Sequence, residues 1–201
     1  MNTHRALIAV MNIARPGPAR GFATVLVFVV WAMFPVLDAA SQEAAETLFA
    51  RGLEAEKAGR PDSAAKLFQS AAAGGVAAAY GRLGMLAAAR GADKSAADWY
   101  EKGARACDGA SQLGLALANR MGKGRKASGD LAYAWLIAAQ RSKQDWTAEE
   151  VVRLADLERD IPAYMSNEKA TAAYCLGLDL FINACGGHQL VTRLERWVYC
   201  R

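Results

Sequence analysis

The sequence predicts an all-α protein: an α/α superhelical repeat solenoid of about three helix pairs with a C-terminal helical cap. Beyond the first forty residues, helix-forming residues dominate and β-branched residues are few. A pattern of two short helices returns three times between Thr47 and Ser142. One such pair cannot bury its apolar face alone, so successive pairs must stack to form a continuous core.

Residues 1–41 are expected to be a signal peptide or a membrane anchor. Three arginines and no acidic residue lie within 1–20, ahead of a 16-residue apolar run from Phe22 to Leu37. This run is shorter than the roughly 20 residues of a spanning helix, which favours a cleaved export signal. Cleavage after Ser41 would place small side chains at both positions that require them. An uncleaved anchor in the inner membrane is the alternative.

Residues 42–142 are expected to form the helical repeat array. A helix at 42–59 ends at Gly59, and Pro61 begins the next helix, where a missing N–H costs nothing. The second unit repeats this order, with a helix at 77–90 that ends at Gly91 and a helix that begins at Asp93. The third unit runs from 109 to about 140.

The aromatic residues of the second helices recur in register. Leu67 and Phe68 in the first unit correspond to Trp99 and Tyr100 in the second, 32 residues later. Trp135 follows Trp99 by 36 residues, so the additional residues fall in the GKGRKASG loop. A solenoid tolerates insertions in such loops.

The array contains a recurring sequence pattern. Leu-Gly pairs lie in the first helices of two units, and Asp residues begin the second helices. They are Leu83-Gly84, Leu113-Gly114, Asp93 and Asp130. With the Trp99-Tyr100 pair and the alanines after it, these residues resemble the Sel-one-like repeat family, a relative of the tetratricopeptide repeat, over about half of the chain. The first unit departs from the pattern, with Arg51-Gly52-Leu53. The resemblance implies an adaptor or regulator and no reaction.

Residues 143–201 are expected to form a C-terminal helical capping region. Thr147 and Glu150 have the spacing of a capping box ahead of a helix whose apolar residues include Val151 and Val152. Ser166 is expected to cap a second helix that runs to about 184. A last helix is predicted at 189–199.

The four cysteines predict two disulfides if the chain is exported. Cys175 and Cys185 would lie about 15 Å apart on one straight helix, too far for the roughly 7 Å limit of a disulfide. A hairpin at residues 186–187 brings Cys175 opposite Cys200, which leaves Cys107 for Cys185. Four free thiols in a cytosolic protein are the alternative.

No catalytic, cofactor or metal site is expected. Cys185 and His188 could offer two metal ligands, but a closed zinc site needs four. His188 is also the only histidine after the leader, and no nucleophile elbow accompanies it.

The basic loop is the candidate partner-binding surface, and its residues are Arg120, Lys123, Arg125 and Lys126. It could dock an acidic partner or anionic lipid headgroups, and solvated loop charge is the plain alternative. From residue 42 onward the net charge is only +2, which does not support binding to nucleic acid.

The predicted function is that of an exported helical-repeat adaptor or regulatory protein that mediates protein–protein interaction in the cell envelope. Its location would be periplasmic or secreted, or anchored in the inner membrane and facing the periplasm. The alternative function is a cell-wall or β-lactam-directed hydrolase of the cysteine-rich repeat type.

Overall fold

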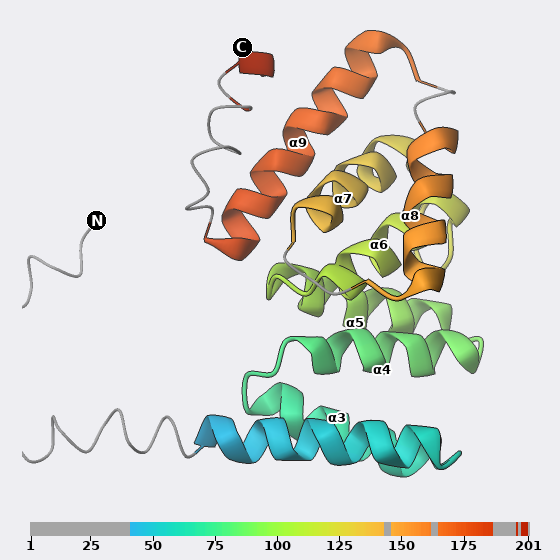
Figure 1. The fold of residues 1–201 in the computed structure, drawn as a ribbon. Helices are drawn as coiled ribbons and strands as arrows, with labels where there is room; N and C mark the ends of the chain where they lie inside the picture. Colours follow the sequence, from blue (N-terminus) through green and yellow to red (C-terminus); the bar gives the residue numbers. More distant parts are fainter. Residues whose placement is uncertain (1–40, 143–145, 162–164, 187–195, 197, 201) are drawn as a thin grey trace, which may run out of the picture. The chain divides into compact units, whose positions relative to one another are not determined.

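The computed structural model describes residues 41–142, 146–161, 165–186, 196 and 198–200. The predicted leader and His188 lie outside these residues, as does most of the predicted last helix. By its internal contacts the chain divides into two units, Met1–Ser41 and Gln42–Arg201, and the description below concerns the second. All regular structure in the described ranges is helical (Figure 1), which confirms the all-α prediction. Among these residues no helix is both long and apolar enough to cross a bilayer.

The helices of the array begin and end close to the predicted residues. A helix at 41–57 is followed by α3 (Pro61–Ala73), α4 (Ala78–Ala89), α5 (Asp93–Arg105), α6 (Gly109–Met121) and α7 (Gly129–Arg141). Two further helices complete the described part, α8 (Ala148–Asp160) and α9 (Asn167–Cys185). Each helix from α3 to α7 packs on the next one in the chain, and α9 packs on α7 (Figure 1).

Local capping chemistry sets most of these boundaries. Gly91 has φ = 73°, a left-handed conformation that ends a helix without the steric cost of a side chain. Thr147 and Glu150 form the predicted capping box at α8, because each side chain accepts a hydrogen bond from the backbone N–H of the other residue. The Ser166 side chain caps α9 by accepting a hydrogen bond from the Lys169 N–H at 3.4 Å.

The ring of Tyr100 explains the glycines of the two Leu-Gly pairs. It lies between Gly84 of α4 and Gly114 of α6. A Cβ atom added to Gly84 would be 2.9 Å from Cζ of Tyr100, and one added to Gly114 would be 2.6 Å from its Cδ1. Real Cβ atoms are essentially never closer than 3.0 Å to such neighbours. The glycines therefore let three helices approach around one aromatic side chain.

The first unit keeps this arrangement, although its residues depart from the Leu-Gly pattern. A Cβ on Gly52 would lie 2.5 Å from Cε1 of Phe68. Gly52 and Phe68 precede Gly84 and Tyr100 by 32 residues each, which is the offset expected from the aromatic register. Glycine is therefore required at this place in both units for the same steric reason.

Helix α9 carries a further Leu-Gly pair, Leu176-Gly177, which the motif search missed. A Cβ on Gly177 would meet the Ala134 carbonyl oxygen at 2.5 Å and Ile137 Cβ at 2.7 Å, both on α7. Glycine thus allows α9 to approach α7 closely, as Gly114 allows α6 to approach α5. Helix α9, which was expected to belong only to a terminal cap, therefore packs like the first helix of another unit.

Two hydrophobic clusters form the core, and α5 contributes to both. Trp99 packs against the cluster of the 41–57 helix, α3 and α4, which includes Phe68 and Leu83. Tyr100 packs against the cluster of α6, α7, α8 and α9, which includes Leu136. Of the apolar residues that follow the capping box on α8, Leu154 and Leu157 are buried, whereas Val151 and Val152 are not. They are 51% and 59% exposed, because α8 contacts the core through other positions.

Two disulfides join distant parts of the chain, and they are the pairs predicted from the sequence. The long-range disulfide, Cys107–Cys185, connects the turn before α6 to the end of α9, with a Cα–Cα distance of 4.9 Å. The terminal disulfide, Cys175–Cys200, has a Cα–Cα distance of 5.6 Å. Together they use all four cysteines of the chain. Such bonds fit an oxidising compartment outside the cytoplasm.

Candidate binding groove

A groove of about 890 Å³ lies beside the first helices of the repeated pairs. We call it the central groove. The 41–57 helix, α4, the start of α6 and the start of α8 line it. The residues that define it are Phe49, Leu53, Ala78, Met85, Asp108 and Glu150. Its volume is within the range of sites that bind small ligands or short peptide segments.

The α6 end of the central groove is built around Asp108. Its carboxylate caps α6, accepting hydrogen bonds from the Ser111 N–H at 2.8 Å and from the Ser111 hydroxyl at 2.5 Å. Gly81 of α4 makes room for it, because a Cβ there would be 2.6 Å from Asp108 Oδ2. Burial raises the pKa of Asp108, since desolvation penalises the charged form, and the nearby Glu150 acts in the same direction.

The α8 end of the central groove carries charges that are already paired. The Glu150 carboxylate accepts hydrogen bonds from the N–H and the hydroxyl of Thr147, at 2.9 and 2.8 Å. Arg153 forms an ion pair with Glu149, one turn earlier on the same helix. On the opposite wall Arg82 lies 3.7 Å from Glu56. The groove therefore combines an apolar wall with polar groups held in fixed positions.

Arg153 also lines a second pocket of about 350 Å³, between α5 and α6. Tyr100 and Lys123 line this pocket as well. Burial raises the pKa of Tyr100, and the Arg153 charge partly offsets that shift. One arginine on α8 thus faces both hollows, so a ligand longer than the central groove could continue past Arg153 toward Lys123.

In the structure one residue of the basic loop is held by an ion pair within the chain. Arg125 Nη2 lies 3.0 Å from Glu101 Oε2, and the Arg125 side chain is only 23% exposed. Arg120 lines a separate pocket beside the start of α7. Lys123 lines the pocket behind Tyr100, and Lys126 is exposed. Arg125 is therefore a structural residue that ties the loop to α5.

The hydroxyl groups of Ser111 and Thr147, at the two ends of the groove, both donate hydrogen bonds to carboxylates of this chain. The Ser111 hydroxyl meets a carboxylate, but Ser111 is fully buried and its hydroxyl serves the cap of α6. Within the described ranges no group of three or more His, Cys, Asp or Glu residues is placed to hold a metal ion.

Sequence reasoning missed Asp108 and Arg153, and both carried weak signals. Asp108 precedes Ser111 by three residues at the start of a helix, the spacing of an N-cap interaction. Arg153 had only its spacing from Glu149 to mark it, which indicates an ordinary surface ion pair. Its position beside the groove depends on how α8 packs. No family model and no curated protein matches the chain.

Proposed function

We propose that this protein is an exported α/α-solenoid adaptor of the cell envelope, which binds an extended segment of a protein partner in the central groove. The observation that best supports this proposal is the central groove, which has a volume of about 890 Å³. The first helices of successive units and α8 line it. The relation to Sel-one-like repeats is part of this proposal, and the recurring glycine–aromatic contacts support it.

The character of the groove favours a protein segment over a strongly charged ligand. Phe49, Leu53 and Met85 offer apolar contact area, while the ionised groups at its ends already have partners within the chain. The disulfides fit an envelope location, and a rigid stack lowers the ordering cost of binding.

A photo-crosslinking experiment tests the groove. A photoreactive phenylalanine analogue replaces Ala78, which is exposed and lines the groove, or Ala89, which is exposed at the other end of the same helix. We expect one identified envelope protein to cross-link from position 78 and not from position 89. Equal capture from both positions would argue against the groove.

The decisive measurement is the affinity between this protein and the cross-linked envelope protein, each purified. Ala78→Arg, which fills the groove, should weaken binding at least tenfold, whereas Lys123→Ala with Lys126→Ala should change it less than threefold. The opposite ranking would return the docking surface to the basic loop. N-terminal sequencing of the purified protein settles the leader, because a start near Gln42 supports cleavage and a start at Met1 or Met11 supports an anchor.

A further inference from the structure

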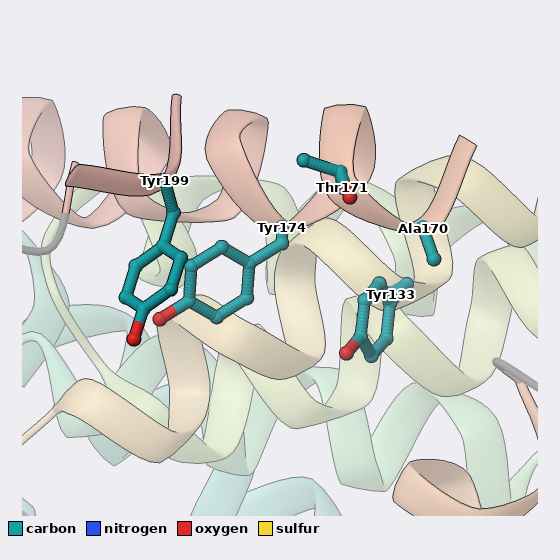
Figure 2. Close-up of a pocket in the computed structure, with 5 residues that line it drawn as sticks. All are labelled: Tyr133, Ala170, Thr171, Tyr174 and Tyr199. Atoms are coloured by element: carbon teal, nitrogen blue, oxygen red, sulfur yellow. The ribbon is translucent and has the colours of Figure 1, made fainter. Parts of the chain in front are cut away.

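A further hollow lies apart from the central groove and is lined largely by tyrosines. It has a volume of about 400 Å³, and its lining residues are Tyr133, Ala170, Thr171, Tyr174 and Tyr199. We call it the tyrosine pocket. It shares no lining residue with the central groove. Figure 2 shows the three rings in a row, with Ala170 and Thr171 on the helix beside them.

A covalent bond holds two of the three rings in place. Tyr174 and Tyr199 each directly precede a cysteine of the terminal disulfide. Their rings meet edge to face, with centroids 6.3 Å apart and an interplanar angle of 83°. Arg141 Nη2 donates a hydrogen bond to the Tyr174 hydroxyl at 3.0 Å. The aromatic surface is thus ordered before a ligand arrives, which lowers the entropic cost of binding.

The charges around the tyrosine pocket select a neutral ligand. None of the five lining residues that the structure describes is charged. The Arg141 guanidinium lies 5.8 Å from the centroid of the Tyr174 ring, so it would repel a cation there. Glu158 acts electrostatically on Tyr133 and, together with burial of the ring, raises the pKa of that phenol. The Tyr133 hydroxyl therefore stays protonated at neutral pH and can donate a hydrogen bond.

Two classes of neutral ligand are compared for the tyrosine pocket, a saccharide and an uncharged peptide. A saccharide presents many hydroxyl groups that need planar polar partners such as carboxylates and amides, and no lining residue supplies them. A proline-rich segment presents apolar rings and carbonyl acceptors. In a polyproline II helix, with three residues per turn, the proline rings on one face form a row, and aromatic-lined surfaces recognise such a row.

We propose that the tyrosine pocket binds a proline-rich segment of an envelope protein in the polyproline II conformation. Proline rings would pack against the exposed sides of the tyrosine rings, and the phenol hydroxyls would donate hydrogen bonds to the carbonyl groups of the segment. Ala170, Thr171 and Tyr174 line the pocket from α9, and Tyr133 lines it from α7. The proposal does not depend on what the central groove binds.

Titration of the purified, disulfide-bonded protein with ring-labelled tyrosine tests the proposal. The probe is decaproline with blocked ends, and the matched control is a blocked Gly-Ser peptide of equal length. We expect decaproline to shift the ring signals of Tyr133, Tyr174 and Tyr199 in a saturable manner. No shift, or an equal shift with the Gly-Ser peptide, would overturn the proposal. Shifts produced instead by a neutral tetramer of N-acetylglucosamine would assign the pocket to saccharides.

Two variants keep the test independent of folding. Tyr199→Ala removes a ring that is 62% exposed, so the fold should survive, and decaproline binding should weaken at least tenfold. Tyr133→Phe keeps the ring and should weaken binding about threefold by removing one donor. Tyr80→Phe, which removes a hydroxyl from a different part of the chain, is its control and should have no effect. Unchanged affinity in Tyr199→Ala would overturn the proposal.

Discussion

Tyr100 lies between two glycines. Replacing Gly84 by alanine should therefore change the free energy of unfolding in opposite directions with and without the Tyr100 ring. We expect Gly84→Ala to destabilise the protein although alanine is the better helix former. The new Cβ would lie 2.9 Å from Cζ of Tyr100, and nearer still to other ring atoms. The ring has little room to retreat, because Gly114 of α6 also faces it so closely that a Cβ added there would lie 2.6 Å from its Cδ1.

The magnitude follows from two opposing terms. Overpacking a well-packed site destabilises a protein by about 1–3 kcal/mol. Because the ring has little room on either side, we take the upper end of this range, about 3 kcal/mol. Replacing glycine by alanine within a helix contributes about 1 kcal/mol in the other direction. Gly84→Ala should therefore lower the free energy of unfolding by about 2 kcal/mol. In a Tyr100→Ala background the clash is absent, so the same change should raise it by about 1 kcal/mol.

The assay is urea unfolding of the four proteins of this cycle, followed by circular dichroism. Gly129→Ala is the matched control, because a Cβ there meets nothing within 4 Å. It should be neutral or stabilising in both backgrounds. If Gly84→Ala destabilises equally with and without the Tyr100 ring, the steric explanation of the Leu-Gly pairs is wrong.

Three further predictions concern the disulfides, a helix cap and a buried carboxyl group. Replacing both cysteines of the long-range disulfide by serine should cost about 4.5 kcal/mol, and the same change in the terminal disulfide about 3.5 kcal/mol, because the closed loops span 78 and 25 residues. Urea unfolding should give this order, and the reverse order would contradict the chain-entropy reasoning. Thr147→Ala should cost about 1 kcal/mol by removing the cap of α8, read as a lower thermal midpoint, and an unchanged midpoint would mean that the cap does not stabilise the fold. Because the folded pKa of Asp108 is raised, its stabilising contribution is present below the ordinary aspartate pKa and is lost as the pH rises through the folded value. Asp108→Asn should remove that decline in unfolding free energy with pH, and parallel pH profiles for the two proteins would refute the assignment.

Some features of the candidate sites could be predicted because their cause lies nearby in the chain. The connectivity of the disulfides followed from the rise of a helix and the position of one Gly-Gly turn. The capping box at Thr147 and Glu150 could likewise be identified from the identity and spacing of its residues. The capping box depends on a few consecutive residues, so the packing of the whole chain does not change it. The pairing of Cys107 with Cys185 followed only by elimination, once Cys175 was assigned to Cys200.

Other features depend on contacts between residues far apart in the chain. The basic loop was a dense cluster in sequence, but Arg125 pairs with Glu101, 24 residues earlier, and the remaining loop residues do not share one pocket. The tyrosine pocket had a signal in the two Tyr-Cys dipeptides, but nothing in the sequence placed Tyr133 beside them.

The sequence by itself determined the all-helical character, most helix boundaries in the array and the two disulfide pairs. Helix propensity, capping and the geometry of a turn act over a few residues, so they can be evaluated without the fold. Only the tertiary structure decided the position of α8 beside the central groove, the exposure of Val151 and Val152, and the assembly of the tyrosine pocket. These depend on which helix faces meet, and that is settled by the packing of side chains from distant segments against one another.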